Sequence, residues 1–329
     1  MTLPASAGHA PEIVVLGSIN MDQVFRTAVL PARGETVAGS GMRYEPGGKG
    51  ANQAVAAARQ QARVAMIACV GVDEHGRTLT RKLAEDGIDI SQVRTCAAAV
   101  TGVAAILVSD AGDNSIVVIG GANQRLNASD IDSAQPLIAR AGVLICQLES
   151  PPAVVAHAMR VARACGVLTV FNPAPAHAML AELMALADVL IVNESEAAQL
   201  SGLTVATTIQ ARAAAQVLLS MGPAQVIVTL GGAGLLLAEP GSIRHLAAPA
   251  VNVVDTTAAG DTFVGAFAAA LVRGETLDEA AASAQYAAAL TVTRHGAQSA
   301  IPGLREVEQF RRTAALQTGS QAPIKSAAD

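Results

Sequence analysis

The sequence predicts an α/β fold in which a central, mostly parallel sheet carries helices on both faces and a small β-sheet lid covers its strand ends. Two observations predict the main sheet: short, almost entirely apolar runs recur along the chain, and segments with helical spacing lie between several of them. Strands buried on both faces form continuous apolar runs, and their alternation with helices is typical of a parallel sheet. A third observation, two extended segments that break this alternation, predicts the lid.

Five apolar runs are the predicted strands of the main sheet. In chain order they are Ile13–Leu16, Val143–Cys146, Val167–Phe171, Val189–Val192 and Val226–Leu230. Ala and Leu recur with helical spacing in stretches such as Ala153–Ala164 and Ala211–Leu219, which predicts helices there. We therefore expect a single α/β domain over residues 1–316 and a small, polar, disordered tail over residues 317–329.

The two extended segments do not follow the strand–helix alternation. Thr36–Tyr44 and Thr101–Ile119 have period-two character, and a turn at Asp110–Asn114 divides the second. We expect antiparallel strands outside the main sheet, in a lid that spans about residues 19–45 and 100–120. Such a lid would exclude water from a reacting group. The pattern alone also allows these segments to extend the edge of the main sheet.

The composition excludes several classes of function. The chain has 329 residues, with 22 Lys and Arg against 27 Asp and Glu, so its formal net charge is −5. This acidic balance, with 5 Phe, 2 Tyr and no Trp, argues against nucleic acid as a partner. We expect no membrane partner either, because no apolar run is long enough to span one and no signal peptide precedes the domain. Four isolated cysteines are typical of a reduced, cytoplasmic protein.

Polar residues or glycines follow all five predicted strands. They are Gly17, Asn20 and Asp22 after the first, Gln147 and Glu149 after the second, Asn172 after the third, Asn193 and Glu196 after the fourth, and Gly231–Gly234 after the fifth. Ligands of open parallel sheets bind at the carboxyl ends of the strands. Any one of these residues could simply cap a helix or form a turn, but together they favour one assembled site.

A glycine cluster, Gly47-Gly48-Lys49-Gly50-Ala51-Asn52, precedes the helical run Gln53–Gln61. Such a cluster lets backbone N–H groups approach a polar ligand closely, although a tight turn is the commoner explanation. It is not a Walker loop, because Gly50 stands where Ser or Thr would hold magnesium, and it lacks the third glycine of a dinucleotide-binding fingerprint.

A second motif, Asp255-Thr256-Thr257-Ala258-Ala259-Gly260-Asp261, leads into the helical run Thr262–Arg273. Three small residues at the start of a helix leave its first N–H groups unobstructed, which makes an anion hole. Asp261 could be a capping carboxylate, worth about 1 kcal/mol. It could also be a general base for a hydroxyl that attacks a phosphoryl group, and the preceding glycine favours this second role.

A third motif is Asn193-Glu194-Ser195-Glu196, which follows a buried strand. Glu196 could complete a capping box with Asn193 or could order water around a magnesium ion, and the spacing does not decide between them. No two histidines have metal-ligand spacing, so a zinc site is not expected.

Together these motifs resemble the ribokinase (PfkB) carbohydrate-kinase family over about residues 12–302. The resemblance depends on six motifs in the family's order. They are GGKGANQAVAA at Gly47–Ala57, QLESP at Gln147–Pro151, NPAPA at Asn172–Ala176, NESEA at Asn193–Ala197, TLGGAG at Thr229–Gly234 and DTTAAGDTF at Asp255–Phe263. The resemblance implies a ribokinase-like fold and ATP-dependent phosphorylation of D-ribose on its 5-hydroxyl.

The resemblance also implies roles for individual residues. Asp261 matches the catalytic base, and the amides of Ala258, Ala259 and Gly260 match the anion hole. The sugar-binding positions are Asn20, Asp22, Gly48, Lys49, Gly50, Ala51, Asn52 and Glu149. The ATP-binding positions are Asn193, Thr229, Leu230, Gly231, Gly232, Ala233, Gly234, Gly260, Asp261 and Gln285. Glu196 matches the acid that organises Mg²⁺, and Gln285 stands where the family has a histidine near the adenine.

A potassium site beside the anion hole is implied as well. Its matching positions are Asp255, Thr257, Thr291, Arg294, Gly296 and Ala300, several of which would supply backbone carbonyls. K⁺ there would orient the anion-hole loop. The chain departs from the family pattern at Ala300, where a serine is expected, and Ser299 lies one residue early. In this family the lid also forms the contact of a homodimer.

Two alternatives remain open at the level of the sequence. One is a sister kinase that acts on deoxyribose, fructose or a nucleoside, since a few hydrogen bonds decide sugar specificity. The other is a non-catalytic sugar sensor that has kept the fold. The intact Asp261 and the Ala-Ala-Gly loop argue against the sensor.

Overall fold

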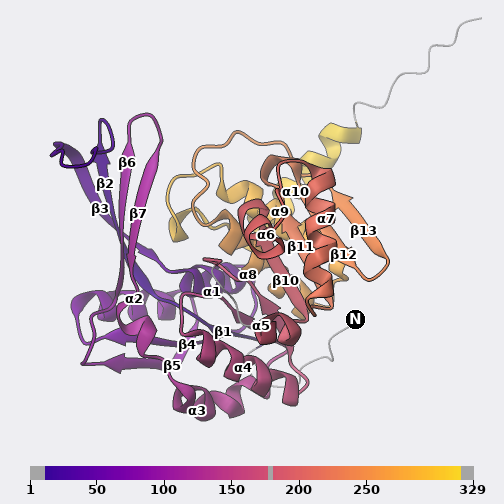
Figure 1. The fold of residues 1–329 in the computed structure, drawn as a ribbon, viewed down its shortest axis with the longest axis horizontal. Helices are drawn as coiled ribbons and strands as arrows, with labels where there is room; N and C mark the ends of the chain where they lie inside the picture. Colours follow the sequence, from indigo (N-terminus) through magenta and orange to yellow (C-terminus); the bar gives the residue numbers. More distant parts are fainter. Residues whose placement is uncertain (1–11, 177–180, 320–329) are drawn as a thin grey trace, which may run out of the picture.

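The computed structural model describes residues 12–176 and 181–319, which form two β-sheets and their flanking helices (Figure 1). The main sheet comprises β1 (Ile13–Leu16), β4 (Val64–Gly71), β5 (Asp89–Cys96), β8 (Val143–Cys146), β9 (Leu168–Phe171), β10 (Val189–Asn193), β11 (Gln225–Thr229), β12 (Leu235–Glu239) and β13 (Ser242–Leu246). Their order is β13-β12-β11-β10-β9-β8-β1-β4-β5. Strands β11 to β5 are parallel, and the hairpin β12–β13 is antiparallel to them. The mostly parallel sheet is therefore confirmed.

The five predicted strands correspond to β1, β8, β9, β10 and β11, with boundaries that differ by a residue at most. Strand β4 is an apolar run of the same kind that the sequence analysis did not assign. Strands β5 and β13 lie at the two edges of the sheet and are only partly buried. Because their exposed positions carry polar residues, no continuous apolar run marks them.

Helices cover both faces of the main sheet. One face packs against α1 (Lys49–Arg59), α2 (Glu74–Glu85), α8 (Ala259–Val272), α9 (Leu277–Thr291) and α10 (Leu304–Gly319). The other packs against α3 (Ala128–Ile138), α4 (Pro152–Ala164), α5 (Ala181–Leu186), α6 (Glu194–Ser201) and α7 (Thr208–Ser220). Alternate residues of one strand serve the two cores: Ile13 and Val15 belong to the first, Val14 and Leu16 to the second.

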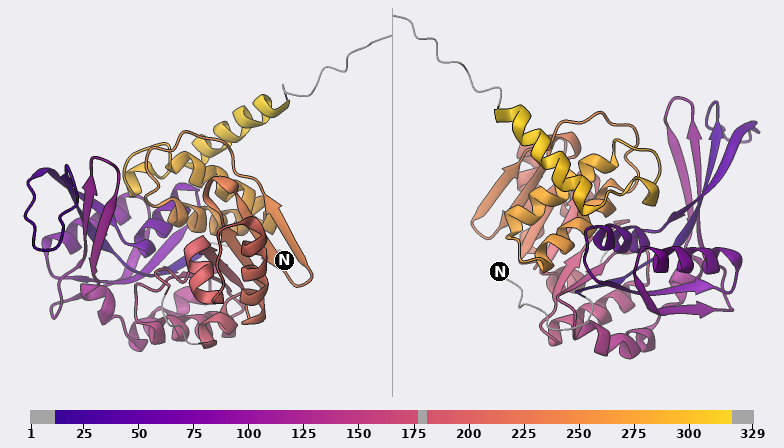
Figure 2. Two further views of the ribbon diagram at one scale, coloured as in Figure 1. Left: turned by 45° about the horizontal axis from the view of Figure 1, so that its top comes forward. Right: turned by 180° about the vertical axis from the view of Figure 1, so that it is seen from behind.

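The lid is a separate sheet of four described strands that projects from the rest of the molecule (Figures 1 and 2). It comprises β2 (Asn20–Thr27), β3 (Gly39–Gly47), β6 (Gly102–Ser109) and β7 (Asn114–Ile119), in the order β3-β2-β6-β7. An extension of the main sheet is thereby excluded. As expected, the two predicted segments form antiparallel pairs, β3 with β2 and β6 with β7, but β2 and β6 pair with each other in parallel, which the sequence analysis did not predict.

Two further expectations concern the end of the chain and membranes. The predicted tail begins too early, since residues 317–319 still belong to α10, and residues 320–329 lie outside the described part of the chain. Among the described residues, no helix has both the length and the apolar character needed to cross a membrane.

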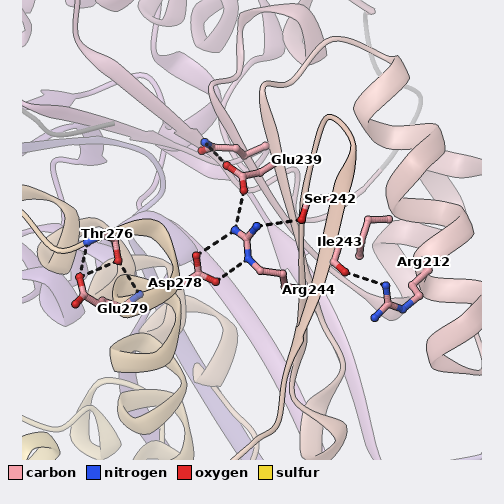
Figure 3. Close-up of polar contacts among 9 residues, drawn as sticks. Arg212, Glu239, Ser242, Ile243, Arg244, Thr276, Asp278 and Glu279 are labelled. Carbon is pink, nitrogen blue, oxygen red and sulfur yellow. Dashed lines mark hydrogen bonds and ion pairs between the residues drawn. The ribbon is translucent and has the colours of Figure 1, made fainter.

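The hairpin β12–β13 is fixed to the helices on either side of it (Figure 3). The Arg244 guanidinium donates to Glu239 at 2.7 Å and to Asp278 of α9 at 2.8 Å. On the other side, Arg212 of α7 donates to the Ile243 carbonyl at 2.9 Å. These contacts hold β13, and the chain continues from the end of this strand at Leu246 into one wall of the pocket described below.

Candidate active site

The candidate site lies where the order of the strands changes direction. The chain runs from β1 to β4 and β5 on one side, and from β8 to β11 on the other, so the crossovers diverge between β1 and β8. Glu149, just beyond β8, accepts hydrogen bonds there from the Ser18 hydroxyl after β1 and from the Lys49 N–H at 3.1 Å. Ligands of parallel sheets bind at the point where the strand order changes direction, and these hydrogen bonds bring the glycine loop to that point.

Asp22 lies on β2 at the base of the lid, and its side chain is 9% exposed. Its carboxylate lies against Gly47, where any side chain would overlap it. Close packing of this kind explains why the first glycine of the loop has to be glycine.

The electrostatic surroundings of Asp22 disfavour its charge. Burial and, after it, the nearby carboxylates of Glu149, Glu45 and Asp261 raise the pKa of Asp22 to about 7, against the opposing effect of Lys49. The pKa of Lys49 is also raised, mainly by Asp261, despite the opposing effect of burial. One ammonium group thus lies among several carboxylates, an arrangement that suits hydrogen bonding to a neutral, hydroxyl-rich ligand.

Asn20 also faces the base of the lid, and its amide orientation is determined by a residue that the sequence analysis missed. Asn123, in the short helix η1 (Gly121–Arg125), donates to the Asn20 carbonyl oxygen at 2.7 Å. The Asn123 carbonyl oxygen accepts from the Ile19 N–H at 3.0 Å. The Asn20 amide group is therefore directed as a donor. No local pattern identifies Asn123, because its partners lie more than a hundred residues earlier.

Asp261 occupies the first turn of α8, and its side chain is 8% exposed. Its two oxygens accept hydrogen bonds from the Asn52 amide at 2.9 Å and the Gln53 amide at 3.0 Å. The helix starts at Ala258, which has a φ of 59°, without a side-chain cap. Asp261 therefore does not cap α8. Its carboxylate is directed away from the backbone of this helix, toward α1.

A cavity of about 450 Å³ opens beside the start of α8. Its walls include Thr229, Gly231, Gly232, Gly234, Gly260 and Gln285 from the predicted ATP-binding set, together with apolar residues of the chain after β13 and of α9. Gln285 donates to the Leu246 carbonyl at 3.3 Å. Four residues of the predicted ATP-binding set do not line this cavity: Asn193, Leu230, Ala233 and Asp261. Leu230 is buried, and Glu196, the predicted magnesium residue, also lies outside the walls.

Asn193 and Glu196 form a capping box at the start of α6. The Asn193 side chain accepts from the Glu196 N–H at 2.8 Å, and the Glu196 carboxylate accepts from the Asn193 N–H at 2.9 Å. The capping box that the sequence allowed is thus present, and it occupies one carboxylate oxygen of Glu196. Burial raises the pKa of Glu196, opposed by the Asn193 N–H and by Lys49. The Glu196 side chain is half-buried, and a cation beside it would offset this effect of burial.

The predicted potassium positions lie on two chain segments that Asp255 joins. Its carboxylate accepts from the Thr257 N–H at 2.9 Å and from the Gly296 N–H at 3.0 Å. Burial opposes ionisation of Asp255, but these hydrogen bonds outweigh it and lower the pKa of the carboxyl.

The remaining potassium positions differ in orientation. The Thr291 hydroxyl bonds to Thr262 and to a helix carbonyl, and the Arg294 side chain points away to Glu306. Ala300 is fully buried in the short helix η3 (Gln298–Ala300). The Ser299 hydroxyl donates to the His295 carbonyl at 3.3 Å.

Comparison with known proteins gives a consistent family. A family model described as "pfkB family carbohydrate kinase" matches residues 10–304. A ribokinase of Haemophilus influenzae is 42% identical over 298 residues, which are 91% of this chain and 97% of that protein. A deoxyribokinase of Salmonella typhi is 36% identical over 303 residues, or 91% and 98% of the two chains. The structure of Arabidopsis thaliana ribokinase complexed with ribose and ATP has a TM-score of 0.85 at 31% identity, over 92% of this chain and 99% of that one.

Proposed function

This chain belongs to the pfkB family of carbohydrate kinases, and we propose that it transfers the terminal phosphate of ATP to the 5-hydroxyl of D-ribose, giving D-ribose 5-phosphate. The observation that carries this proposal is the position of Asp261. Its carboxylate is held by two amides in the first turn of α8, and the neighbouring residues Ala259 and Gly260 line a cavity large enough for a nucleotide.

The proposed mechanism divides the work between the two sides of the site. The sugar is held on the lid side by Asn20, Asp22, Gly48, Lys49, Gly50, Ala51, Asn52 and Glu149. Asp22 as a carboxylate accepts hydrogen bonds from two neighbouring hydroxyls. Asp261 takes the proton from the attacking hydroxyl, while the N–H groups of Ala258, Ala259 and Gly260 stabilise the charge on the transferring group. The lid keeps water away from the reacting phosphate.

Two cations belong to this proposal. Bound with ATP, Mg²⁺ would neutralise phosphate charge, and Glu196 would hold it through water. Asp255 and backbone carbonyls of Thr257, Thr291, Arg294 and Gly296 would hold K⁺. The two chain segments that the Asp255 carboxylate joins fit such a site, whereas Ala300 has no hydroxyl group to contribute.

The first prediction tests the base and the substrate together. We expect ribose-dependent ADP release from the wild-type enzyme, stimulated by K⁺ over Na⁺, and a fall of at least about 100-fold in kcat for Asp261→Ala. Ribose binding, measured by calorimetry, should persist in the variant. Asp132→Ala, which removes an exposed carboxylate of α3, is the matched control and should keep wild-type kcat. Ordinary turnover by Asp261→Ala would refute the assigned base.

The same assay separates the sister activities. Deoxyribose, fructose and adenosine replace ribose in parallel reactions, and the preferred sugar has the highest kcat/KM. Calorimetric binding of a sugar without any ADP release under Mg²⁺ and K⁺ would support a sensor instead.

We further propose a homodimer formed through the lid, and action in the cytoplasm. The four residues Ile116–Ile119 of β7 are each more than half exposed, which is an unusual row of apolar side chains for a free surface. The four cysteines are free thiols, as in proteins of a reducing compartment.

A further inference from the structure

Two chains of side-chain amides converge on Asp261, and we propose that Gln53 is a positioning residue for the phosphoryl transfer. The inference rests on the proposed role of Asp261 as general base. Gln53 would act through Asp261 rather than on the sugar or the nucleotide. It would hold the carboxylate in one orientation so that a lone pair faces the attacking hydroxyl.

The first amide chain runs through Gln53, whose side chain is fully buried. Its amide nitrogen donates to Asp261 Oδ1 at 3.0 Å and to Asn172 Oδ1 at 3.1 Å. Its carbonyl oxygen accepts from the Gln147 amide at 2.6 Å. Asn172 in turn donates to the Ile191 carbonyl at 2.9 Å. Strands β8, β9 and β10 therefore all contribute to the orientation of the Gln53 amide.

The second chain approaches from the opposite side of the carboxylate. Gln298, in the loop proposed to surround K⁺, donates to the Asn52 carbonyl oxygen at 3.1 Å. Asn52 donates to Asp261 Oδ2 at 2.9 Å. Each oxygen of Asp261 thus receives one N–H from a neighbouring residue of α1. Rotation of the carboxylate would break both bonds, so the pair defines its plane.

A role limited to core packing does not explain Gln53. Apart from Asn52, which also donates to Asp261, the other buried residues of α1 are four alanines, Gly50 and Val55, which pack without polar side-chain groups. A buried amide has to be hydrogen-bonded, and an apolar residue of similar size would avoid that requirement. Here the amides of Gln147, Gln53 and Asn172 are all satisfied as donors, and the chain ends on the one carboxylate that the reaction uses.

Gln53→Met tests the proposal, because methionine keeps the volume and cannot donate. We expect kcat to fall on the order of 10- to 100-fold, since misplacement of a reacting group by about 1 Å can have an effect of that size. KM for ribose and for ATP should stay within about twofold, because the residue touches neither substrate. Gln53→Glu keeps the shape but presents an oxygen to Asp261, and it should lower kcat at least as much.

Gln60→Met is the matched control on the same helix. Gln60 is 3% exposed and donates to the Pro302 carbonyl at 3.0 Å, away from Asp261. We expect both Gln60→Met and Gln53→Met to lower Tm, but we expect Gln60→Met to leave kcat unchanged. If the Gln53 variants do not fold, Gln147→Met removes only the outer link of the chain, and a several-fold fall in kcat is then expected.

The outcomes separate this inference from the proposed function. Wild-type kcat in folded Gln53→Met, with an inactive Asp261→Ala, overturns the positioning role alone. A fall in kcat that Gln60→Met reproduces at equal Tm also overturns it. Full activity of Asp261→Ala overturns the proposed function first, and the inference with it.

Discussion

The surroundings of Asp22 suit a bound ligand, but they destabilise the ligand-free protein. Its carboxylate is buried against Gly47 and lies near other carboxylates, so the sugar-free site favours the protonated form. Hydrogen bonds from sugar hydroxyls favour the ionised form. Binding and protonation at Asp22 therefore oppose each other, and their balance changes near neutral pH.

This opposition predicts a pH-dependent affinity for the sugar. Because the pKa of Asp22 is raised to about 7, we expect KM for ribose to rise as the pH falls below that value. The limit is about tenfold per pH unit. Asp22→Asn should raise KM at every pH and remove this dependence. Initial rates at saturating ATP between about pH 5.5 and 8.5 measure both effects; a flat KM for the wild type would contradict the assignment.

Stability should respond to pH in the opposite sense. The native pKa of Asp22 lies above its unfolded value of 3.8, so the folded protein binds the additional proton between these two values. The free energy of unfolding contributed by Asp22 is thus highest below pH 3.8 and falls as the pH rises toward 7. Asp22→Asn should accordingly stabilise the sugar-free protein at about pH 8, on the order of 2 kcal/mol. Thermal denaturation without ribose at several pH values is the measurement.

At the scale of elements, the crossing of α1 and α8 brings the glycine loop and the start of α8 together, and with them the two parts of the proposed site. Helix α1 begins at Lys49, four residues before the helical run that the sequence indicated. Gly48, with a φ of 91°, precedes it, and the Ala51 N–H donates to the Ser18 carbonyl at 2.9 Å. The helix thus starts inside the glycine loop, and its first residues face the site. Gly265 of α8 contacts α1 directly, because a Cβ there would lie 2.6 Å from the Ala56 Cβ.

Two glycines of α8 predict opposite effects of the same substitution. Gly265→Ala should destabilise the protein by about 1–3 kcal/mol, because the added methyl group has no space between the helices. Gly260→Ala should keep or slightly raise Tm, since no atom lies within 4 Å of its Cβ position and alanine favours helix. Its methyl group would instead project at the anion hole and lower kcat/KM for ATP. Thermal denaturation and steady-state kinetics of both variants test the pair; equal Tm shifts would contradict it.

At the scale of the whole molecule, the lid is the part that the monomer leaves least covered. The lid projects from the main body. It contacts helix α2, where the ring centroids of Tyr44 of β3 and His75 of α2 lie 5.7 Å apart. Its strand β7 exposes all of its six residues. A second copy of the lid would cover these side chains, which is the physical basis of the proposed homodimer.

Charges on β7 should therefore disrupt the dimer. Val117 and Val118 point to opposite faces of the lid, so the double variant Val117→Lys/Val118→Lys places an ammonium group on each. We expect sedimentation velocity to show a dimer for the wild type and a monomer for this variant. Ile209→Lys, at a position that is 80% exposed on α7, is the control and should remain dimeric. A monomeric wild type, or a dimeric double variant, would contradict the proposal.

The sequence by itself determined five strands of the main sheet and the two loops, because their signals are local. Apolar runs such as Val143–Cys146 predict buried strands, and the glycines of Gly47–Asn52 and Ala258–Gly260 predict exposed backbone N–H groups. The family resemblance then indicated sugar phosphorylation. Strand β5 and the parallel pairing of β2 with β6 escaped prediction, because edge burial and strand order depend on partners distant in the chain.

Only the tertiary structure decided the surroundings of the two reactive carboxylates. Gln53, Asn123 and Gln298 lack any local sign of their role, and Gln298 reaches Asn52 across a separation of 246 residues. The pKa of Asp22 depends likewise on how deeply the lid base is buried and on which carboxylates lie near it. Hydrogen bonds and desolvation act over a few ångströms of space rather than along the chain, so these properties exist only once α1, α8 and the strand ends have packed together.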